Sequence, residues 1–321
     1  MKAFTINSND CNQRLDRFIG KVTCNLSGTL VNKYIRLKRI KVNGKRSENN
    51  YKLQMGDLVE MYINDEFFPL PENSSLSFMN APDGLNIVYE DENIILCDKP
   101  VGLIVHEDEK ESCDTLINRI LKYLYKKGEF DPSNEHSFTP ALCNRIDRNT
   151  GGIVIGAKNA EALRIMNLLI KERLLIKKYL LITNGRPPKM KDTVTSYMLK
   201  NERENKVYVY DRPREGAKTA ITEYKVLEYK NGFSLIEVIL HTGRTHQIRA
   251  QMSHLGCPLL GDGKYGINRD DKRLGFKSQA LYSYKLSFNA GDKAESLSYL
   301  NGKTFEVKDV WLKKEFDRIT R

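Results

Sequence analysis

The chain has 321 residues, of which 40% are hydrophobic and 29% charged, a balance that excludes disorder throughout and suggests about two domains. No apolar run approaches the roughly 20 residues that a membrane span needs, and the opening MKAFTINSNDC lacks the apolar core of a secretory signal. We therefore expect a cytoplasmic protein without a membrane segment. The net charge of +11 favours an anionic partner, most commonly nucleic acid, over a merely basic surface.

The cysteines and histidines form no metal-binding or redox motif. The six cysteines are Cys11, Cys24, Cys97, Cys113, Cys143 and Cys257. No two of them lie within four positions of each other, so there is no CxxC pair, and we expect free thiols. His246 and His254 fall on one expected helix, about 12 Å apart along its axis, which is too far for one ion. We expect no metal site.

A long basic stretch marks the N-terminal part of the chain. Residues 17–47 hold nine Lys and Arg residues and no Asp or Glu. Within them, TLVNKYIRLKRI predicts a helix with Leu30, Tyr34 and Leu37 on its apolar face, followed by a short strand in IKVNGK. Residues 10–64 thus predict a small α+β unit whose basic edge favours an RNA or DNA contact over a solvated face. The candidate RNA-binding residues are Arg36, Lys38, Arg39, Lys41 and Lys45.

Residues 67–86, rich in Pro and Ser, predict a linker. Beyond it, residues 114–126 predict a helix with Asp114 as its N-cap and one apolar face. The expected inward residues of this helix are Leu116, Ile120, Leu121 and Leu124. The next helix, AEALRIMNLLIKE, follows the buried strand GIVIGA and is expected to turn Leu163, Met166, Leu169 and Ile170 inward.

Residues 190–216 are polar and charged and predict an inserted hairpin or a flexible arm. The alternating stretch TAITEYKVLEYKNGFSLIEVIL predicts a second hairpin that turns at Asn231-Gly232. HTGRTHQIRAQMSHLGCP predicts a turn and then a helix that stops at Gly256. The larger part of the chain therefore predicts a mixed, mainly antiparallel α+β fold rather than regular βαβ winding.

Several kinds of chemistry lack their motifs. The chain has no GxxxxGK[ST] phosphate loop, no GxGxxG at a strand–helix junction and no GxSxG nucleophile elbow. The strongest local feature is NRIDRNTGG, which places Asp147 between Arg145 and Arg148 in a turn before a buried strand. Opposite charges favour an ionised carboxylate, which can act as nucleophile or base. From this segment alone, a structural Asp–Arg pair is an equally good interpretation.

The second feature is HTGRTHQIR, residues 241–249. Arg244 and Arg249 supply the planar donors that suit a carboxylate or a phosphate, at a helix N-terminus that favours an anion. The alternative is that both arginines are ordinary surface residues at the start of a helix.

Four segments carry a resemblance to a known family. DENIILCDKPVGLIVH, NRIDRNTGGIVIGAK, KKYLLITNG and LHTGRTHQIRAQMSHLGCPLLGDGKYG occur in this order and resemble successive motifs of the RluA family of pseudouridine synthases. The basic N-terminal unit resembles the small RNA-binding module shared with a small-subunit ribosomal protein, an arrangement similar to the ribosomal large-subunit branch. The resemblance implies an RNA-binding module at 1–66, a linker at 67–86 and a pseudouridine synthase catalytic domain at 87–321.

By this resemblance, the protein isomerises uridine to pseudouridine within RNA and needs no cofactor or metal. The uracil detaches from the ribose, rotates and reattaches through C5. Asp147 is implied as the essential carboxylate and Arg244 as the arginine that pairs with it, while Tyr179 stacks on the target base. Whether the carboxylate attacks the sugar or removes a sugar proton is left open. Ile248 is implied on the other face of the base. The rest of the expected substrate pocket is Arg145, Thr150 and His246.

Three positions depart from the family pattern: Asn144, Gly151 and Gln251 stand where His, Ser and His are common. They put pocket hydration and substrate preference in question. The N-terminal module favours 23S ribosomal RNA as the substrate over transfer RNA. A non-catalytic RNA-binding assembly factor is a further alternative, while a DNA-binding protein is disfavoured because no recognition helix is evident. We expect a monomer, since no heptad or apolar dimer face is visible.

Overall fold

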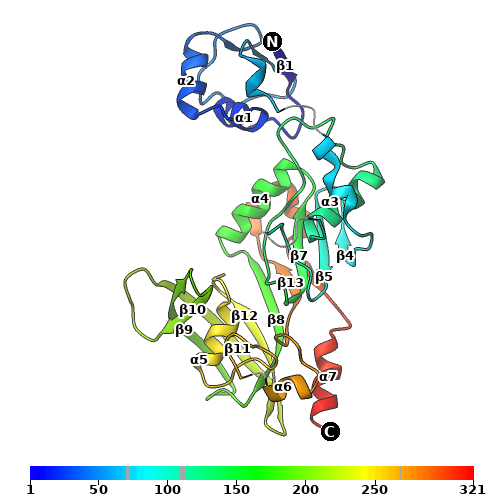
Figure 1. Cartoon of the computed structure of the whole chain (residues 1–321), viewed down its shortest axis with the longest axis vertical. Coiled ribbons are helices and arrows are strands. Elements are labelled where there is room, and N and C mark those ends of the chain that lie inside the picture. The colour runs from blue at the N-terminus through cyan, green and yellow to red at the C-terminus, as the bar shows by residue number, and fades with distance from the viewer. Residues whose placement is uncertain (70–72, 109–112, 268) are drawn as a thin grey trace.

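The computed structural model describes residues 1–69, 73–108, 113–267 and 269–321, so residues 70–72 of the expected linker lie outside it. The described strands form a three-stranded sheet near the N-terminus and an eleven-stranded sheet in the rest of the chain. Figure 1 shows the small sheet and its helices at one end of the long axis, with the C-terminus at the opposite end. No helix in the described ranges is long and apolar enough to cross a membrane.

The N-terminal unit packs two helices against its small antiparallel sheet, in the strand order β1-β3-β2. Its elements are β1 (Lys2–Thr5), α1 (Leu15–Val22), α2 (Gly28–Arg36), β2 (Ile40–Val42) and β3 (Leu58–Met61). The expected apolar face of α2 was only partly correct, because Tyr34 packs at the edge of the core while Leu30 and Leu37 do not. Val31 and Ile35 are buried, while Leu37 follows the end of the helix and is 53% exposed. The difference matters because Val31 and Ile35, four residues apart, meet the same core with α1.

The large sheet is mixed and mainly antiparallel, as predicted. Its strands are β4 (Ile87–Glu90), β5 (Ile94–Lys99), β6 (Ala141–Leu142), β7 (Gly151–Ala157), β8 (Leu175–Asn184), β9 (Lys191–Asn201), β10 (Lys206–Tyr210), β11 (Lys218–Lys230), β12 (Phe233–Leu240), β13 (Leu281–Phe288) and β14 (Thr304–Glu306). The main path runs β10-β9-β11-β12-β8-β13-β7-β5-β4. Within the described strands, the parallel pairing is that of β13 with β7. It joins the strand after the Asp147 turn to the centre of the sheet.

Helices cover both faces of the sheet where β5 and β7 run. The remaining helices are α3 (Leu116–Lys127), α4 (Ala160–Lys171), α5 (Gln247–His254), α6 (Arg269–Arg273) and α7 (Trp311–Ile319). Ile95 and Cys97 pack with α3, while their neighbours Ile94 and Leu96 pack with α4 on the opposite face. A strand buried on both faces needs a continuous apolar run, and this explains IILC and GIVIGA.

Helix α3 turns the four predicted residues inward, but Thr115 rather than Asp114 is its N-cap. The Thr115 hydroxyl accepts from the backbone N–H of Asn118, while Asp114 instead pairs with Arg119. In α4, Met166 and Leu169 are buried as predicted. Leu163 and Ile170 are partly buried at the edges of the same cluster. The apolar pattern therefore located the helices better than their end residues.

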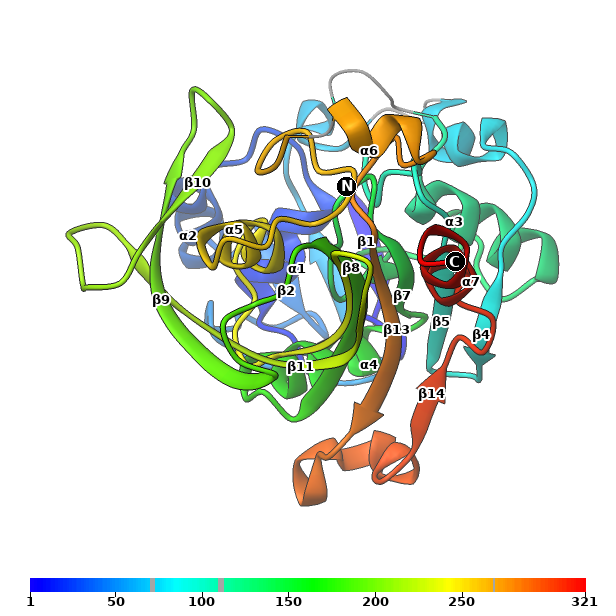
Figure 2. The same cartoon turned by 90° about the horizontal axis from the view of Figure 1, so that it is seen from below.

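The polar segment 190–216 folds as the hairpin β9–β10 and extends the large sheet. Strand β9 pairs with β11 over eight residues, so the hairpin is anchored along the sheet rather than free. Helix α5 packs through Ile248 and Met252 on the face formed by β8, β11 and β12. Figure 2 shows α5 inside the curve of these strands. This packing brings the start of α5 close to the Asp147 turn.

The segment expected as a linker makes contacts with both units. Phe68 belongs to the core of the N-terminal unit. Phe78 lies in a short 3-10 helical stretch, Asn73–Asn80, and packs with α3 in the larger unit. Its aromatic neighbours there are Tyr125 and Phe130. Both described ends of this segment are thus held by apolar burial.

Candidate active site

The turn that carries Asp147 is fixed by hydrogen bonds from three directions. The backbone N–H of Thr150 donates to the Asp147 carbonyl at 3.0 Å and closes the turn. The Arg148 carbonyl accepts from the Gly102 N–H and from Lys99 Nζ, each at 2.9 Å. The Asn144 side chain accepts from the N–H of Ile155 on β7 at 2.8 Å. The backbone around the carboxylate is therefore held before any substrate arrives.

Two glycines let this turn enter the sheet. A Cβ on Gly152, whose φ is +112°, would lie 2.1 Å from the Ser283 carbonyl oxygen of β13. A Cβ on Gly151 would lie 2.5 Å from the ring of Tyr282, whose hydroxyl donates to Asp98. The departure from the family pattern at Gly151 is thus matched by an aromatic ring that occupies the space of a side chain.

Lys99, at the end of β5, donates a hydrogen bond to the backbone of the Asp147 turn. Its ammonium group is buried and donates to the carbonyls of Pro100, Leu103 and Arg148 at 2.6–2.9 Å. These three acceptors match the three N–H bonds of an ammonium. Burial lowers the pKa of Lys99 to about 7, and the nearby Asp147 carboxylate opposes that fall. Lys99 thus ties the end of β5 to the Asp147 turn.

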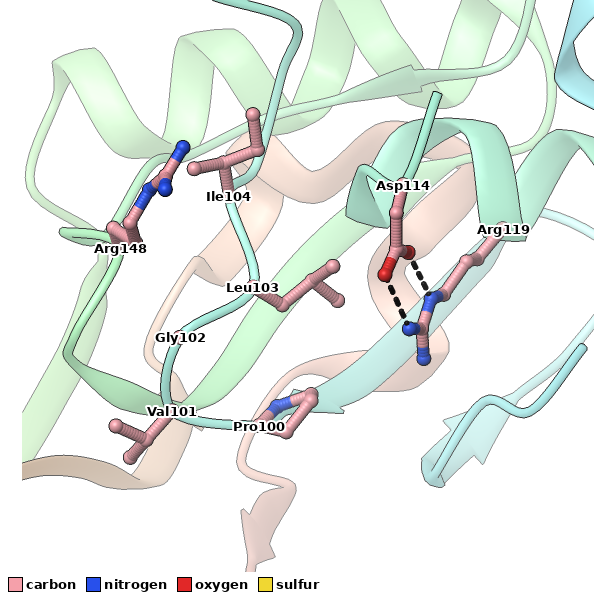
Figure 3. Close-up of a pocket in the computed structure, with 8 residues that line it drawn as sticks. All are labelled: Pro100, Val101, Gly102, Leu103, Ile104, Asp114, Arg119 and Arg148. Carbon is pink, nitrogen blue, oxygen red and sulfur yellow. Dashed lines mark hydrogen bonds and ion pairs between the residues drawn. The ribbon is translucent and has the colours of Figure 1, made fainter. Parts of the chain in front are cut away.

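A polar hollow of about 260 Å³ lies on the outer side of the same loop. Figure 3 shows residues 100–104 between Arg148 on one side and the Asp114–Arg119 pair on the other. Arg119 makes two hydrogen bonds to Asp114, at 2.7 and 2.9 Å. Arg148 lies at the exposed rim and contacts Asp108 at 3.2 Å.

The Asp147 carboxylate is paired with Arg249 of α5. Arg249 Nη1 lies 2.8 Å from Asp147 Oδ2. The Asp147 side chain is 30% exposed and the Arg249 side chain 9%, so the carboxylate is partly accessible while its partner is buried. Arg249 is gripped from behind by the fully buried Asp262, with N–O distances of 2.7 and 2.9 Å. A guanidinium held in this bidentate way is a fixed donor.

The charges of this cluster are stabilised by one another. Burial lowers the pKa of Arg249, but Asp262 and Asp147 outweigh burial and raise it above its ordinary value. Burial raises the pKa of Asp262, but the Arg249 guanidinium and two backbone N–H groups hold it below its ordinary value. Arg249 therefore stays charged beside Asp147.

The expectation that Arg244 pairs with Asp147 was wrong. Arg244 is exposed in the turn before α5, and its Nε donates to the Thr219 carbonyl at 3.0 Å. The Gln247 side chain accepts from the Arg244 N–H and fixes that turn. Arg249 is the third residue of α5, within a stretch that is buried from Gln247 to Met252. The helix therefore turns the second arginine, not the first, towards the carboxylate.

His246, which was predicted as a pocket residue, lies near Asp147 without a hydrogen bond to it. Its Nε2 lies 3.9 Å from Asp147 Oδ2, and its Nδ1 lies 2.9 Å from the Tyr265 hydroxyl. His246 is the N-cap of α5 and has a φ of +53°, in the left-handed region. Burial lowers the pKa of His246, and the charge of Asp147 opposes that effect.

Tyr179 of β8 and Ile248 of α5 are both buried in one apolar cluster, which Ile146 of the Asp147 turn also joins. Burial raises the pKa of the Tyr179 hydroxyl to about 12, with a smaller contribution from the Asp147 charge. The phenol is therefore neutral at physiological pH. The structure thus gathers an aromatic ring, an aliphatic side chain and a carboxylate at one place.

The other expected pocket residues lie further from the carboxylate. Arg145 is exposed, and its charge adds to burial in lowering the pKa of His106. Thr150 is buried, and its hydroxyl accepts from Gln279 at 3.4 Å. Arg145 thus lies at the surface, while the Thr150 side chain is buried in the interior.

The five basic residues expected to contact RNA lie around α2 and β2. Arg36, Lys38, Arg39 and Lys45 are exposed, and Lys41 is half-buried. Two of the five lie on tyrosine rings. Arg39 lies 5.6 Å from the ring centre of Tyr34, and Lys41 lies 5.2 Å from that of Tyr62. Positive charge and aromatic surface therefore occur together on this unit.

Lys99, Asp262 and Tyr265 were not predicted as site residues, and Arg249 was predicted only as one of two planar donors that suit a carboxylate or a phosphate. A signal for Arg249 was present, because an arginine inside a buried helical run needs a carboxylate partner. Asp262 lies in a turn whose burial no periodicity reveals. Within the described ranges, no three His, Cys, Asp or Glu side chains gather in a way that could hold a metal ion.

Comparison with known proteins agrees with this arrangement. The family model for RNA pseudouridylate synthases matches residues 93–254, which include β5, the Asp147 turn, Tyr179 and α5. A protein of Mycoplasma genitalium named as an uncharacterized RNA pseudouridine synthase is 36% identical over 283 residues, 86% of each chain. The ribosomal large subunit pseudouridine synthase C of Rickettsia prowazekii is 35% identical over 264 residues, 79% of this chain and 82% of the relative.

Among solved structures, human RNA pseudouridylate synthase domain containing 4 aligns with a TM-score of 0.56 and 23% identity. The alignment covers 73% of this chain and 92% of the human one. This similarity shows that the two proteins share a fold.

Proposed function

We propose that this chain, an RNA-modifying isomerase of the RNA pseudouridylate synthase family, converts uridine to pseudouridine in ribosomal RNA of the large subunit. In this proposal Asp147 is the essential carboxylate, and no cofactor is needed. The observation that carries the catalytic part is the pairing of a partly exposed Asp147 with a buried, doubly held Arg249. A fixed guanidinium holds a positive charge beside the carboxylate, at the point where a nucleotide can reach it.

The reaction needs this charge in either of two roles. The N1–C1′ bond of uridine breaks, the uracil rotates, a C5–C1′ bond forms, C5 loses its hydrogen as a proton and N1 gains one. An ionised Asp147 can attack C1′ or remove a proton from the ribose, and each role requires a free oxygen. Arg249 contacts Oδ2 and leaves Oδ1 for the substrate.

The apolar cluster suits the uracil ring. A base inside a helix cannot rotate, so the target nucleotide must be flipped out of its stack. We infer that Tyr179 stacks on one face of the flipped uracil and Ile248 contacts the other. A neutral phenol, with its pKa raised to about 12, supplies this surface without adding negative charge beside Asp147. Arg145, exposed two residues before Asp147, is accessible for contact with the RNA backbone.

We further propose residues 1–66 as an RNA-binding module. The exposed basic residues around α2 and β2 supply charge for phosphates, and Tyr34 and Tyr62 supply rings for unpaired bases. The choice of large-subunit ribosomal RNA rests on this module together with the name carried by the Rickettsia relative.

Release of tritium from RNA labelled at C5 of uridine tests the substrate, because the new C5–C1′ bond expels that hydrogen. The purified protein is incubated with large-subunit ribosomal RNA and, separately, with transfer RNA. We expect release from the ribosomal RNA. Release from transfer RNA alone would contradict the proposed substrate, and release from neither RNA, with tight binding to both, would favour a non-catalytic assembly factor.

A further inference from the structure

A chain of polar contacts runs from the β9–β10 hairpin to the Asp147 carboxylate. The backbone N–H of Val207, on β10, donates to the Tyr265 hydroxyl oxygen at 2.9 Å. The same hydroxyl lies 2.9 Å from His246 Nδ1. The other ring nitrogen of His246, Nε2, faces Asp147 Oδ2 at 3.9 Å. Three segments far apart in the sequence thus meet at one imidazole.

The bond from Val207 has a fixed direction, and it leaves the Tyr265 proton available for His246. A backbone N–H can only donate, so the Tyr265 oxygen accepts from Val207 and its own proton is free to point at His246. An imidazole nitrogen that accepts a hydrogen bond carries no proton, which places the proton of neutral His246 on Nε2. This tautomer turns an N–H, rather than a lone pair, towards the negative Asp147.

The backbone at His246 also indicates a constrained position. A φ of +53° is uncommon outside glycine, and such a conformation persists when its surroundings hold it. The Tyr265 ring meets the imidazole edge-on, with ring centres 5.6 Å apart. The same ring lies 5.3 Å from the Arg249 guanidinium. Tyr265 therefore contacts both groups that flank Asp147.

We propose that Tyr265 is a positioning residue that fixes the Nε2–H tautomer of His246, so that the contact of Tyr265 with the β9–β10 hairpin decides whether an N–H or a lone pair faces Asp147. This inference rests on the proposed catalytic role of Asp147. It also gives the hairpin a role in the reaction, because β10 supplies the donor that orients the Tyr265 hydroxyl.

The charges around His246 support a neutral imidazole. Asp147 faces it from the turn, Arg249 from α5, and Asp262 and Lys264 from the loop that follows. Burial and the two cations favour the neutral form, and the carboxylates oppose it. Donation from Tyr265 to Nδ1 also favours the neutral form, since a protonated ring has no acceptor there. Removing the hydroxyl should therefore raise the pKa of His246.

Nitrogen-15 NMR of the histidine side chains tests the tautomer without any assay of activity. His246→Asn assigns the signal, and asparagine tolerates the left-handed backbone. We expect the Nε2–H tautomer in the wild type, and a mixed tautomer with a higher pKa in Tyr265→Phe. The control is Tyr208→Phe, which removes an exposed hydroxyl from the same hairpin. A wild-type Nδ1–H tautomer, or an unchanged signal in Tyr265→Phe, overturns the proposal.

Kinetics then test the link to the reaction. Tyr265→Phe should lower kcat about ten-fold, the effect of one lost hydrogen bond, with KM unchanged. It should also move the acidic limb of the kcat profile to higher pH. The double variant with His246→Asn should match His246→Asn alone, because Tyr265 acts through the imidazole. An unchanged kcat, or additive effects, contradicts the proposal. An active Asp147→Asn variant would instead contradict the proposed function and leave the tautomer result intact.

Discussion

One guanidinium lies between two carboxylates at the centre of the site. Arg249 contacts the partly exposed Asp147 on one side and the fully buried Asp262 on the other. With both carboxylates ionised, these three groups together carry one negative charge, and the buried Lys99, whose pKa burial lowers to about 7, lies beneath the turn. Asp262 thus fixes the guanidinium, while the partly exposed Asp147 keeps an oxygen for the substrate. The bidentate grip of Asp262 is what makes the donor rigid.

Exchange of each arginine for lysine should separate the two positions. A lysine at position 249 cannot grip Asp262 with two bonds and reach Asp147 at the same time. Arg249→Lys should therefore lower kcat by about 100-fold, whereas Arg244→Lys should change it less than about three-fold. Tritium release under saturating RNA measures both, with thermal unfolding as a check on folding. A larger loss in Arg244→Lys would mean that the pairing shown here is not the catalytic one.

At the scale of elements, apolar spacing predicted the helices well and their boundaries less well. The face of α3 was predicted correctly because four leucine and isoleucine residues at helical spacing form the buried stripe. The shorter α2 has apolar residues on adjacent stripes, and packing against α1 selected Val31 and Ile35 over Leu30 and Leu37. Such a choice depends on the partner element, which local sequence does not contain.

The site residues, too, could be predicted from local sequence only where their contacts do not depend on a distant element. Asp147, Tyr179 and Ile248 could be located from their motifs. Which arginine meets the carboxylate could not, because that depends on where α5 begins and on Asp262 from a separate turn. Lys99 could not be placed either, since its partners are backbone carbonyls that carry no sequence signal.

The basic residues around α2 and β2 are expected to contribute to RNA binding. Replacing Arg36, Lys38, Arg39 and Lys41 together by alanine should weaken RNA binding because phosphate contacts are lost. It should also flatten the dependence of affinity on salt, by up to about 0.7–0.9 log units of slope for each lost contact. Binding titrations at several salt concentrations measure both effects.

A matched control removes four exposed basic residues at the other end of the molecule: Lys308, Lys313, Lys314 and Arg318. If the two variants lose affinity equally, the N-terminal unit has no special part in holding RNA.

For the whole molecule, a small polar interface connects the two units. The Asn9 side chain donates to Glu135 at 2.8 Å and accepts from the N–H of Ala160, at the start of α4, at 3.0 Å. Ser137 donates to the buried Asp10 at 2.6 Å. In the described part of the chain, one oxygen each of Asp10, Gln13 and Glu135 is buried there without a donor. At Glu135, a buried acceptor without a donor favours the protonated form of the carboxyl.

The contribution of Glu135 to the free energy of unfolding should therefore be greater in mild acid than at neutral pH. Burial raises the pKa of Glu135 above its ordinary value, the hydrogen bond from Asn9 opposes that rise, and the charge of Asp10 adds to it. The folded state binds this proton more tightly, so its contribution to the free energy of unfolding falls as pH rises from the unfolded to the folded pKa. Glu135→Gln should raise Tm at pH 7.5, by on the order of 1–2 °C, and the gain should vanish in acid.

Thermal unfolding across pH 4–8 measures this effect, with the exposed Glu228→Gln on β11 as control. A Tm gain for Glu135→Gln that is the same at every pH would contradict the titration of this interface.

The most direct test of the whole account is tritium release by the wild type and by Asp147→Asn, on the RNA that responds best. The substitution keeps the shape of the side chain and removes its charge, and Asp317→Asn, on the exposed face of α7, is the control. We predict that Asp147→Asn releases no tritium while it binds RNA with nearly wild-type affinity. Release at the wild-type rate would contradict the assignment of this carboxylate and the mechanism built on it.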